Sequence, residues 1–369
     1  MIKAISISNF KSLKLAKLPI KNLNLFTGLN GMGKSSFIQA ILLLRQSFQQ
    51  GMLEDQGLTL KGSLIELGTG KDVFNQYAGK DENIEIKINT EEFNLYWTFG
   101  YLPDADILPI ERKTSYTEVL KTCGIFNKDF QYLNAEHIIP QTTYKKSEFE
   151  VIQNKQIGKY GEYAVHYLSV YGLDNLENEN LIHEKSKSKI LIHNIDAWLN
   201  EISPGVKLIV EDIKGVDLVR LGFQYETESG YTNEFKPINV GYGLTYALPV
   251  ILTLLTAKKG KIIIIENPES HLHPKGQAKI GELAALAAEM GAQIFIETHS
   301  DHILNGVRVA VKEKKINPLN VNIQYFERGN DAEVHESKIS TIEVDRKGEL
   351  SHYPKDLLEE WSNQLLKLL

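Results

Sequence analysis

The chain has one cysteine, Cys123, among its 369 residues. A single cysteine excludes an internal disulfide, a cysteine zinc site and an iron–sulfur cluster. The sequence also lacks any apolar run near the ~18–20 residues that a membrane helix needs. Its first residues alternate like a strand and do not resemble a signal peptide. We therefore expect a cytoplasmic protein with no membrane partner.

The sequence also has no excess of basic over acidic residues. The sequence holds 47 acidic residues against 41 Lys and Arg, a formal net charge of −6. Because proteins that depend on phosphate contacts usually carry a basic excess, DNA could be bound only through a local patch. The basic clusters are Lys145–Lys146 and Lys185–Lys189. We interpret them mainly as solvated loops, with phosphate contact as the alternative.

The pattern of apolar residues predicts an α/β fold. Unbroken apolar strands alternate with helices near both ends of the chain, which indicates a parallel sheet buried on both faces. The middle, residues 51–230, is mixed, with short alternating segments at 84–88 and 93–99. Strands are predicted at 2–7, 23–27, 261–265, 293–297, 321–326, 340–344 and 350–353, and helices at 37–45, 244–255, 277–290 and the C-terminus.

A phosphate-binding loop stands between the second predicted strand and the first helix. The segment Gly28-Leu-Asn-Gly-Met-Gly-Lys-Ser35 fits the pattern G-x-x-x-x-G-K-[ST]. Its glycines let backbone N–H groups surround phosphate oxygens; Lys34 would reach the β- and γ-phosphates, and the Ser35 hydroxyl would bind Mg²⁺. A flexible glycine turn would not explain the lysine and the serine. The predicted ATP contacts are Gly28, Asn30, Gly31, Met32, Gly33, Lys34, Ser35 and Ser36.

Together with the preceding Ile7-Ser-Asn-Phe-Lys-Ser12, this loop resembles the head domain of RecF, SMC and OLD-family ATPases. These proteins form the repair-and-defence branch of the ABC ATPases. The resemblance implies an ABC-type P-loop ATPase head with a mainly parallel sheet core and an antiparallel β portion. It also implies a mixed lobe, residues 76–235, inserted into an ATPase core made of residues 1–75 and 236–369.

Residues 262–274 resemble the Walker B and D-loop segment of that branch. The resemblance implies that Glu266 binds Mg²⁺ together with Ser35. The next position is usually a glutamate that activates water, but here it is Asn267, which can orient a water and cannot accept its proton. Hydrolysis is therefore expected to be slow, with Glu269 as a partial substitute. A zinc site at His271 and His273 is disfavoured because the ligand set is sparse.

Two further segments complete the resemblance. His299 follows the strand 293–297 as the switch histidine does in ABC ATPases. Residues 238–249 occupy the place of the ABC signature, where Gly241, Gly243 and Thr245 would contact the nucleotide of a partner subunit. This motif implies a homodimer, or a higher even oligomer, that sandwiches ATP. A plain glycine loop before a helix is the alternative interpretation.

Two features expected in related proteins, a fused nuclease and a Q-loop, are not recognisable in the sequence. Beyond His302 no second carboxylate cluster resembles a Toprim nuclease, and Ile342 to Glu359 resembles the C-terminal cap of RecF/OLD-like ATPases without a fused nuclease. The resemblance covers 1–75 and 236–369, with scattered matches such as Tyr132–Glu136 between them. A Q-loop is not recognisable, since Leu67–Asp72, near the expected place, contains no glutamine.

Three functions remain open on this basis. The leading hypothesis is an ATP-dependent dimeric switch that engages a separately encoded effector, a nuclease or toxin, in antiphage defence. The second is a RecF-like ATPase that binds DNA in repair. The third is a non-hydrolysing scaffold stabilised by ATP, which Asn267 would explain.

Overall fold

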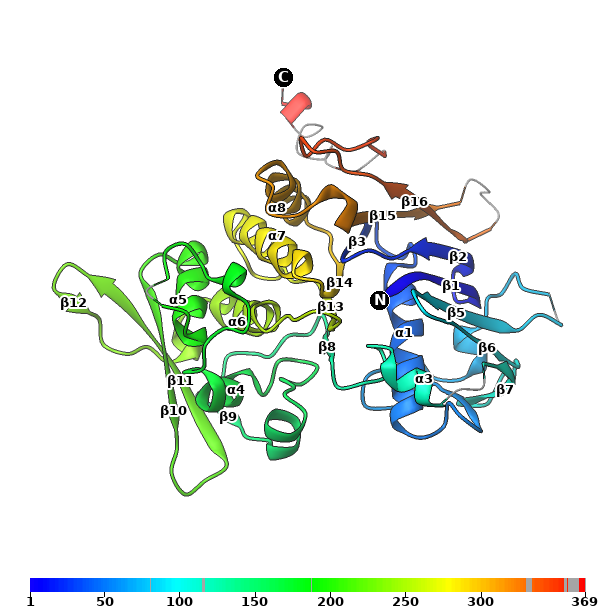
Figure 1. The fold of residues 1–369 in the computed structure, drawn as a ribbon, viewed down its shortest axis with the longest axis horizontal. Coiled ribbons are helices and arrows are strands. Elements are labelled where there is room, and N and C mark those ends of the chain that lie inside the picture. Colours follow the sequence, from blue (N-terminus) through cyan, green and yellow to red (C-terminus); the bar gives the residue numbers. More distant parts are fainter. Residues whose placement is uncertain are drawn as a thin grey trace. The chain divides into compact units, whose positions relative to one another are not determined.

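The computed structural model describes residues 1–79, 81–114, 117–186, 188–329, 334–354, 357 and 365–368. The chain forms two compact units (Figure 1). Unit 1 comprises Met1–Phe130, Val321–Glu343 and Leu350–Leu369, and unit 2 comprises Gln131–Asn320 and Val344–Glu349. The predicted division into a core and an inserted lobe stays a prediction, because compactness does not report where a segment was inserted.

Unit 1 contains an antiparallel sheet with the strand order β2-β1-β5-β6-β7-β4. In β1, β5 and β6 apolar buried residues recur at every second position, as in Ile5 and Ile7 of β1 or Ile86 and Ile88 of β5, so one face forms a core. The strands are β1 (Ile2–Phe10), β2 (Leu13–Pro19), β4 (Gly57–Thr59), β5 (Ile84–Thr90), β6 (Asn94–Phe99) and β7 (Ile107–Lys113).

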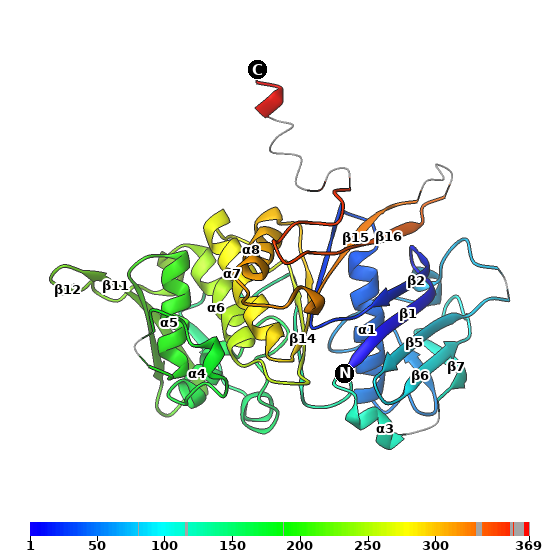
Figure 2. The same cartoon turned by 45° about the horizontal axis from the view of Figure 1, so that its top comes forward.

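A second group of strands in unit 1 carries the phosphate loop. β15 (Val321–Arg328) pairs in parallel with β3 (Leu23–Gly28) and antiparallel with β16 (Ser337–Ile342). Helix α1 (Lys34–Gln49) follows β3 and contacts β1, β2, β3 and β4. Figure 2 shows α1 beside β1 and β2. Short helices α2 (Gly70–Val73) and α3 (Thr117–Thr122) complete this unit.

Unit 2 holds the other buried parallel strands. β13 (Ile262–Glu266) pairs in parallel with β14 (Gln293–Glu297), and β8 (Phe130–Leu133) borders β13 on its other side. A separate antiparallel sheet contains β9 (Thr143–Lys145), β10 (Val206–Asp212), β11 (Leu218–Thr227) and β12 (Gly230–Tyr231). Parallel and antiparallel pairing thus occur together, as the α/β prediction requires.

Helices surround these strands. α4 (Ala164–Tyr171) and α5 (Leu191–Ile202) pack on the sheet of β10 and β11, and α6 (Tyr242–Leu255) lies against α5 and α7. α7 (Pro274–Glu289) and α8 (Asp301–Lys312) lie side by side in both ribbon views. One-turn segments are a π-helix at Glu148–Gln153 and 3₁₀ helices at Glu179–Leu181, Pro237–Asn239 and Pro318–Asn320. Within the described ranges, no helix is long and apolar enough to span a bilayer.

The predicted elements with strong periodicity are confirmed within a few residues, and β14 matches its predicted bounds. The predicted strand at 350–353 is wrong, because only Leu350 forms an isolated bridge there. The turn at 345–348 is present and is closed by the N–H of Gly348 donating to the Asp345 carbonyl at 3.0 Å. Most of the predicted C-terminal helix, and Glu359, lie outside the described residues.

The close approach of α7 and α8 depends on two glycines. A Cβ on Gly306 would lie 2.1 Å from the Ala278 carbonyl oxygen, and a Cβ on Gly281 would lie 2.3 Å from the Ile303 carbonyl oxygen. Both obstacles are backbone atoms, so a side chain there cannot be accommodated by a rotamer change. The two helices must separate if either glycine is replaced.

We predict that Gly306→Ala destabilises the protein by ~1–3 kcal/mol, the usual cost of overpacking a core. Denaturant unfolding measures the change. Val309→Ala is the matched control in α8, because Val309 is 52% exposed. An unchanged midpoint for Gly306→Ala would contradict the tight α7–α8 contact.

Candidate nucleotide site

The phosphate loop has the backbone that its sequence predicts. Gly28, Gly31 and Gly33 have φ of 125°, 74° and 93°, which side-chain-bearing residues rarely adopt. A Cβ on Gly28 would also lie 2.1 Å from the Phe326 carbonyl oxygen of β15. Asn30, Gly31 and Ser35 are exposed, so the loop presents these residues to solvent. Met32 and Ser36 are half-buried.

Lys34 occupies the inside of this loop. Its side chain is only 3% exposed, and its Nζ donates hydrogen bonds of 2.8 Å to the carbonyls of Gly28 and Leu29. α1 begins at Lys34 with Gly33 as its N-cap, and no side chain caps the first N–H groups. A buried ammonium beside a helix N-terminus that lacks a side-chain cap is a suitable place for phosphate oxygens.

The turn between β1 and β2 supports the loop from behind. The Ser337 hydroxyl donates to the Ser12 hydroxyl at 2.7 Å, and a Cβ on Gly33 would collide with both oxygens. Lys11 donates to Gln39 of α1 at 2.8 Å. The Asn-Phe-Lys-Ser segment that suggested the resemblance therefore holds the phosphate loop and α1 in place.

Glu266 ends the buried strand β13 in unit 2. Its Oε1 accepts from the Tyr132 hydroxyl at 3.2 Å, and its Oε2 accepts from the Ala135 N–H at 3.3 Å. Burial raises the pKa of Glu266 to about 7, and the nearby Glu297 charge acts in the same direction. The two hydrogen bonds oppose this shift because they stabilise the ionised form.

The next residue, Asn267, has the left-handed φ of 47° that asparagine tolerates better than most residues. Its N–H donates to the Glu297 carbonyl at 2.8 Å. Its Oδ1 is buried and has no hydrogen-bond partner among the residues that the structure describes. A buried oxygen without a partner is costly, so this atom is suited to accept a hydrogen bond from a water molecule.

Glu269 has both carboxylate oxygens engaged. Oε2 accepts from the Thr298 hydroxyl at 2.8 Å and Oε1 accepts from the His299 N–H at 2.8 Å. These bonds clamp the segment after β13 to the segment after β14, on which His299 is exposed. This geometry favours a positioning role for Glu269 over water activation.

The signature candidate opens helix α6. Gly241 is the N-cap with φ of −58°, no side chain caps the helix, and a Cβ there would meet nothing within 4 Å. Gly243 differs, because a Cβ there would lie 2.7 Å from the His271 carbonyl oxygen. Thr245 is buried. Gly241 is therefore the open position, and Gly243 packs against the segment after β13.

The two histidines of that segment have roles in packing and capping. His271 packs on Tyr242 and Tyr246, with ring centroids 5.6 Å and 4.6 Å away. His273 is the N-cap of α7 and accepts from the Lys275 N–H at 3.3 Å. Across the residues that the structure describes, no group of three or more His, Cys, Asp or Glu forms a metal-binding cluster.

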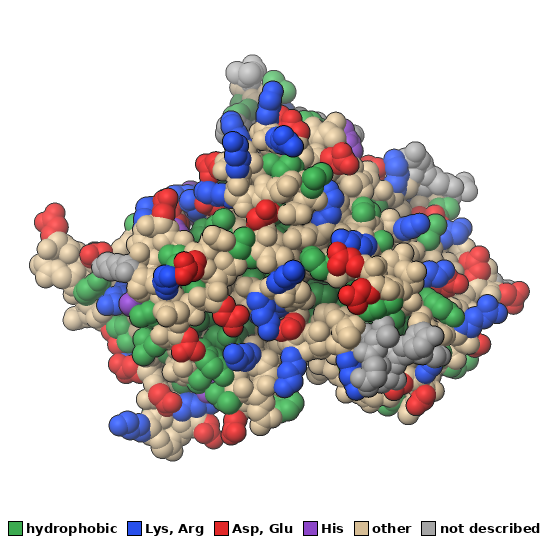
Figure 3. Space-filling view, viewed as in Figure 1, with side chains coloured by type: hydrophobic (Ala, Val, Ile, Leu, Met, Phe, Trp, Pro, Cys, Tyr) green, Lys and Arg blue, Asp and Glu red, His purple; other side chains and the backbone are tan. Residues whose placement is uncertain are grey.

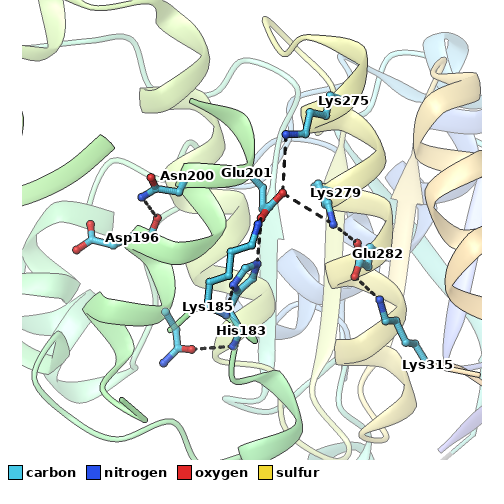
Figure 4. Close-up of polar contacts among 10 residues, drawn as sticks. His183, Lys185, Asp196, Asn200, Glu201, Lys275, Lys279, Glu282 and Lys315 are labelled. Atoms are coloured by element: carbon cyan, nitrogen blue, oxygen red, sulfur yellow. Dashed lines mark hydrogen bonds and ion pairs between the residues drawn. The ribbon is translucent and has the colours of Figure 1, made fainter. Parts of the chain in front are cut away.

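The basic cluster at Lys185–Lys189 is compensated by carboxylates. Lys185 pairs with the buried Glu201 at 2.5 Å, and Lys275 and Lys279 lie 4.0 Å from the same carboxylate (Figure 4). The hydrogen bond from Lys185 lowers the pKa of Glu201. Lys189 pairs with Glu179, and Lys187 lies outside the described residues. The cluster therefore links loop, α5 and α7 and offers little free charge to phosphate.

One segment of the site was not assigned from the sequence. Glu266 is contacted by Tyr132, Ala135 and His137. The segment considered for the Q-loop, Leu67–Asp72, instead forms a Thr69–Asp72 capping box and hydrogen-bonds to residues 103 and 105. The sequence offered only a weak signal, the four-residue β8, which is followed by polar residues as β13 is. Its place beside β13 required the structure.

The residues fit ATP and Mg²⁺. The concave glycine backbone, the buried Lys34 ammonium and the uncapped start of α1 suit a polyphosphate. A single carboxylate suits Mg²⁺, which usually takes one or two carboxylates together with phosphate oxygens and water. The partnerless Asn267 Oδ1 suits an ordered water.

Comparisons with known proteins agree with this geometry. Residues 133–305 match the sequence family described as "AAA domain, putative AbiEii toxin, Type IV TA system". Residues 316–368 match a family of unknown function, DUF3696. No curated protein matches the chain.

Solved structures show the fold. The SMC head bound to the C-winged helix domain of ScpA is 12% identical with a TM-score of 0.51, covering 94% of this chain and 98% of that chain. The chain has the fold of an ABC-type, RecF/SMC-like P-loop ATPase. The predicted resemblance to RecF/SMC-type ATPases and the predicted α/β fold class are confirmed at this level, and membership of the OLD-like branch stays a prediction.

Two further SMC heads are similar. The SMC head domain from Thermotoga maritima is 10% identical with a TM-score of 0.44, covering 93% of this chain and 99% of that chain. The head with an extended coiled coil bound to the C-terminal domain of ScpA, derived from Pyrococcus furiosus, is 13% identical with a TM-score of 0.49, covering 100% and 99%. The match of residues 133–305 to the AAA family supports an ATPase in general terms.

We predict that Mg²⁺ binding strengthens between pH 6 and pH 8. With a pKa of about 7, Glu266 is mostly protonated at the lower pH and mostly ionised at the higher pH, so the half-saturating Mg²⁺ concentration should fall about tenfold. Calorimetry of Mg²⁺ binding to the protein with ATP measures it. Glu266→Gln shows the pH dependence that belongs to the nucleotide alone. If wild type and Glu266→Gln change equally, Glu266 does not titrate in this range.

Proposed function

We propose that this protein is an ATP-binding, slowly hydrolysing ATPase that acts as a dimeric switch on a separately encoded effector. The observation that carries the proposal is the buried Lys34 inside a glycine loop at the start of an uncapped helix. In this proposal Ser35 and Glu266 share Mg²⁺, and His299 contacts the γ-phosphate. The contacts of the loop residues Gly28 to Ser36 with the phosphates belong to the same proposal.

The slow rate follows from the groups available to a water molecule. Asn267 Oδ1 can accept a hydrogen bond from a water but cannot take its proton. The Glu269 carboxylate is held against the segment after β14 by hydrogen bonds from the Thr298 hydroxyl and the His299 N–H. The site would keep the groups that position the phosphates and neutralise their charge, but it would lack an efficient base for the attacking water. A long-lived ATP state suits a switch better than a metabolic ATPase.

A defence context is supported by the description of the matched family, which names a toxin of a toxin–antitoxin system. A protein partner is supported by the SMC head whose solved structure contains a domain of ScpA. By contrast, acidic and basic side chains alternate over the face seen in Figure 3, and the described lysines of the 185–189 cluster pair with carboxylates. The effector proposal is therefore favoured over the DNA-repair alternative.

We propose further that Gly241 and Gly243 at the start of α6 serve the nucleotide of a second copy. Gly241→Asp is the sharper test, because Gly243→Asp would first collide with the His271 carbonyl. Aspartate is a good N-cap, so Gly241→Asp should fold. Its charge would repel a γ-phosphate ~4 Å away by at least ~1 kcal/mol even in water.

We predict that Gly241→Asp weakens ATP-dependent dimerisation at least ~5-fold, the equivalent of that repulsion, without changing ATP binding by the monomer. Light scattering with ATP and Mg²⁺ measures the dimer. Gly241→Asn is the matched control, since it caps the helix without charge and should dimerise better than Gly241→Asp. Lys34→Ala should bind no ATP. Equal dimerisation of the Asp and Asn variants would contradict the proposed contact.

We predict that Asn267→Asp and Asn267→Glu both speed hydrolysis, by up to ~10²-fold, because a carboxylate can accept the proton of the attacking water. Asn267→Asp keeps the side-chain length and tolerates the left-handed backbone, whereas Asn267→Glu adds ~1 kcal/mol of strain. Steady-state phosphate release measures the rate. If neither variant is faster and Glu269→Gln is inactive, Glu269 activates the water.

A further inference from the structure

The segment that follows β8 contacts the end of β13 at three places. The Tyr132 hydroxyl and the Ala135 N–H donate to the two carboxylate oxygens of Glu266, at 3.2 Å and 3.3 Å. The His137 Nε2 lies 3.2 Å from the Glu266 backbone carbonyl. Side chain and backbone of Glu266 are thus held by one stretch of six residues.

The donors themselves are fixed. Tyr132 is 4% exposed and lies on a strand that borders β13, and the second donor is a backbone N–H. Burying a hydroxyl without a partner costs free energy, so the Tyr132 hydroxyl has a strong preference for the carboxylate it faces. Each donor engages one oxygen, which leaves each oxygen able to accept a further interaction.

His137 anchors the segment from the other side. It is 2% exposed, and its ring packs against Tyr246 of α6 with centroids 5.5 Å apart. Burial lowers the pKa of His137, so the ring is neutral near pH 7. The segment is therefore wedged between the end of β13 and α6 and has little freedom to move away from Glu266.

We propose that Tyr132 and the Ala135 N–H are positioning groups that set the orientation of the Glu266 carboxylate for Mg²⁺. The proposal rests on the proposed function, in which Glu266 binds the metal. Carboxylates that bind metals are usually held by outer hydrogen bonds, and removing such a partner weakens metal binding about 10–100-fold. Tyr132 does not touch nucleotide or metal in this role; it acts through Glu266.

The experiment compares Tyr132→Phe with the intact protein. Phenylalanine keeps the ring and removes only the donor, so the half-saturating Mg²⁺ concentration for nucleotide binding should rise about tenfold. ATP affinity with Mg²⁺ chelated by EDTA should not change. Both are read by calorimetry, independently of turnover. Tyr144→Phe is the matched control, because Tyr144 is 1% exposed and its hydroxyl accepts from the Gln141 N–H.

A second variant tests the backbone donor to Glu266. Ala135→Pro removes the other donor and should weaken Mg²⁺ binding in the same direction. In the Glu266→Gln background, Tyr132→Phe should have no further effect on Mg²⁺, because the two groups act as one. If Tyr132→Phe binds Mg²⁺ as wild type does, or weakens ATP binding equally in EDTA, the positioning role is refuted. If Glu266→Gln also leaves Mg²⁺ binding unchanged, the proposed metal role of Glu266 fails instead.

Discussion

The burial of one carboxylate at the end of an apolar strand governs the site in unit 2. β13 consists of four fully buried isoleucines followed by Glu266, so the charge stands at the edge of a core. An isolated buried charge is expensive, and proteins respond by supplying hydrogen bonds or by raising the pKa. Here both occur, through Tyr132, Ala135 and a pKa near 7. A divalent cation would remove the remaining penalty, since it supplies the missing positive charge.

The sequence was informative where a local pattern determines the chemistry. The glycines around Lys34 predicted a loop whose backbone N–H groups could surround phosphate oxygens, and the isoleucines before Glu266 predicted a buried strand. Contacts between distant segments could not be predicted in this way. Tyr132 lies 134 residues before Glu266, and its strand is too short to identify by periodicity. The wrong strand at 350–353 has a similar cause, because alternation alone does not supply a pairing partner.

Backbone conformation explains why Asn267 and Glu269 have different roles. The chain turns sharply after β13 through a left-handed residue, and asparagine is compatible with that turn. The turn leaves the Asn267 amide oxygen buried, with no hydrogen-bond partner in the described part of the chain, while it directs Glu269 to Thr298 and His299. The carboxylate is therefore used to join the ends of two parallel strands. The amide is the group left available to water.

The start of α6, proposed above to serve the nucleotide of a second copy, packs against the segment that follows this strand. Gly243 has no room for a side chain because the His271 carbonyl is so close, and the His271 ring also packs against Tyr242 and Tyr246. His137 contacts Tyr246 from the side of Glu266. Packed side chains thus connect Glu266 to the start of α6 at Gly241, so a displacement of Glu266 can be transmitted to that position. Rigid contacts of this kind transmit small displacements, because a close-packed interior has no free volume to absorb them.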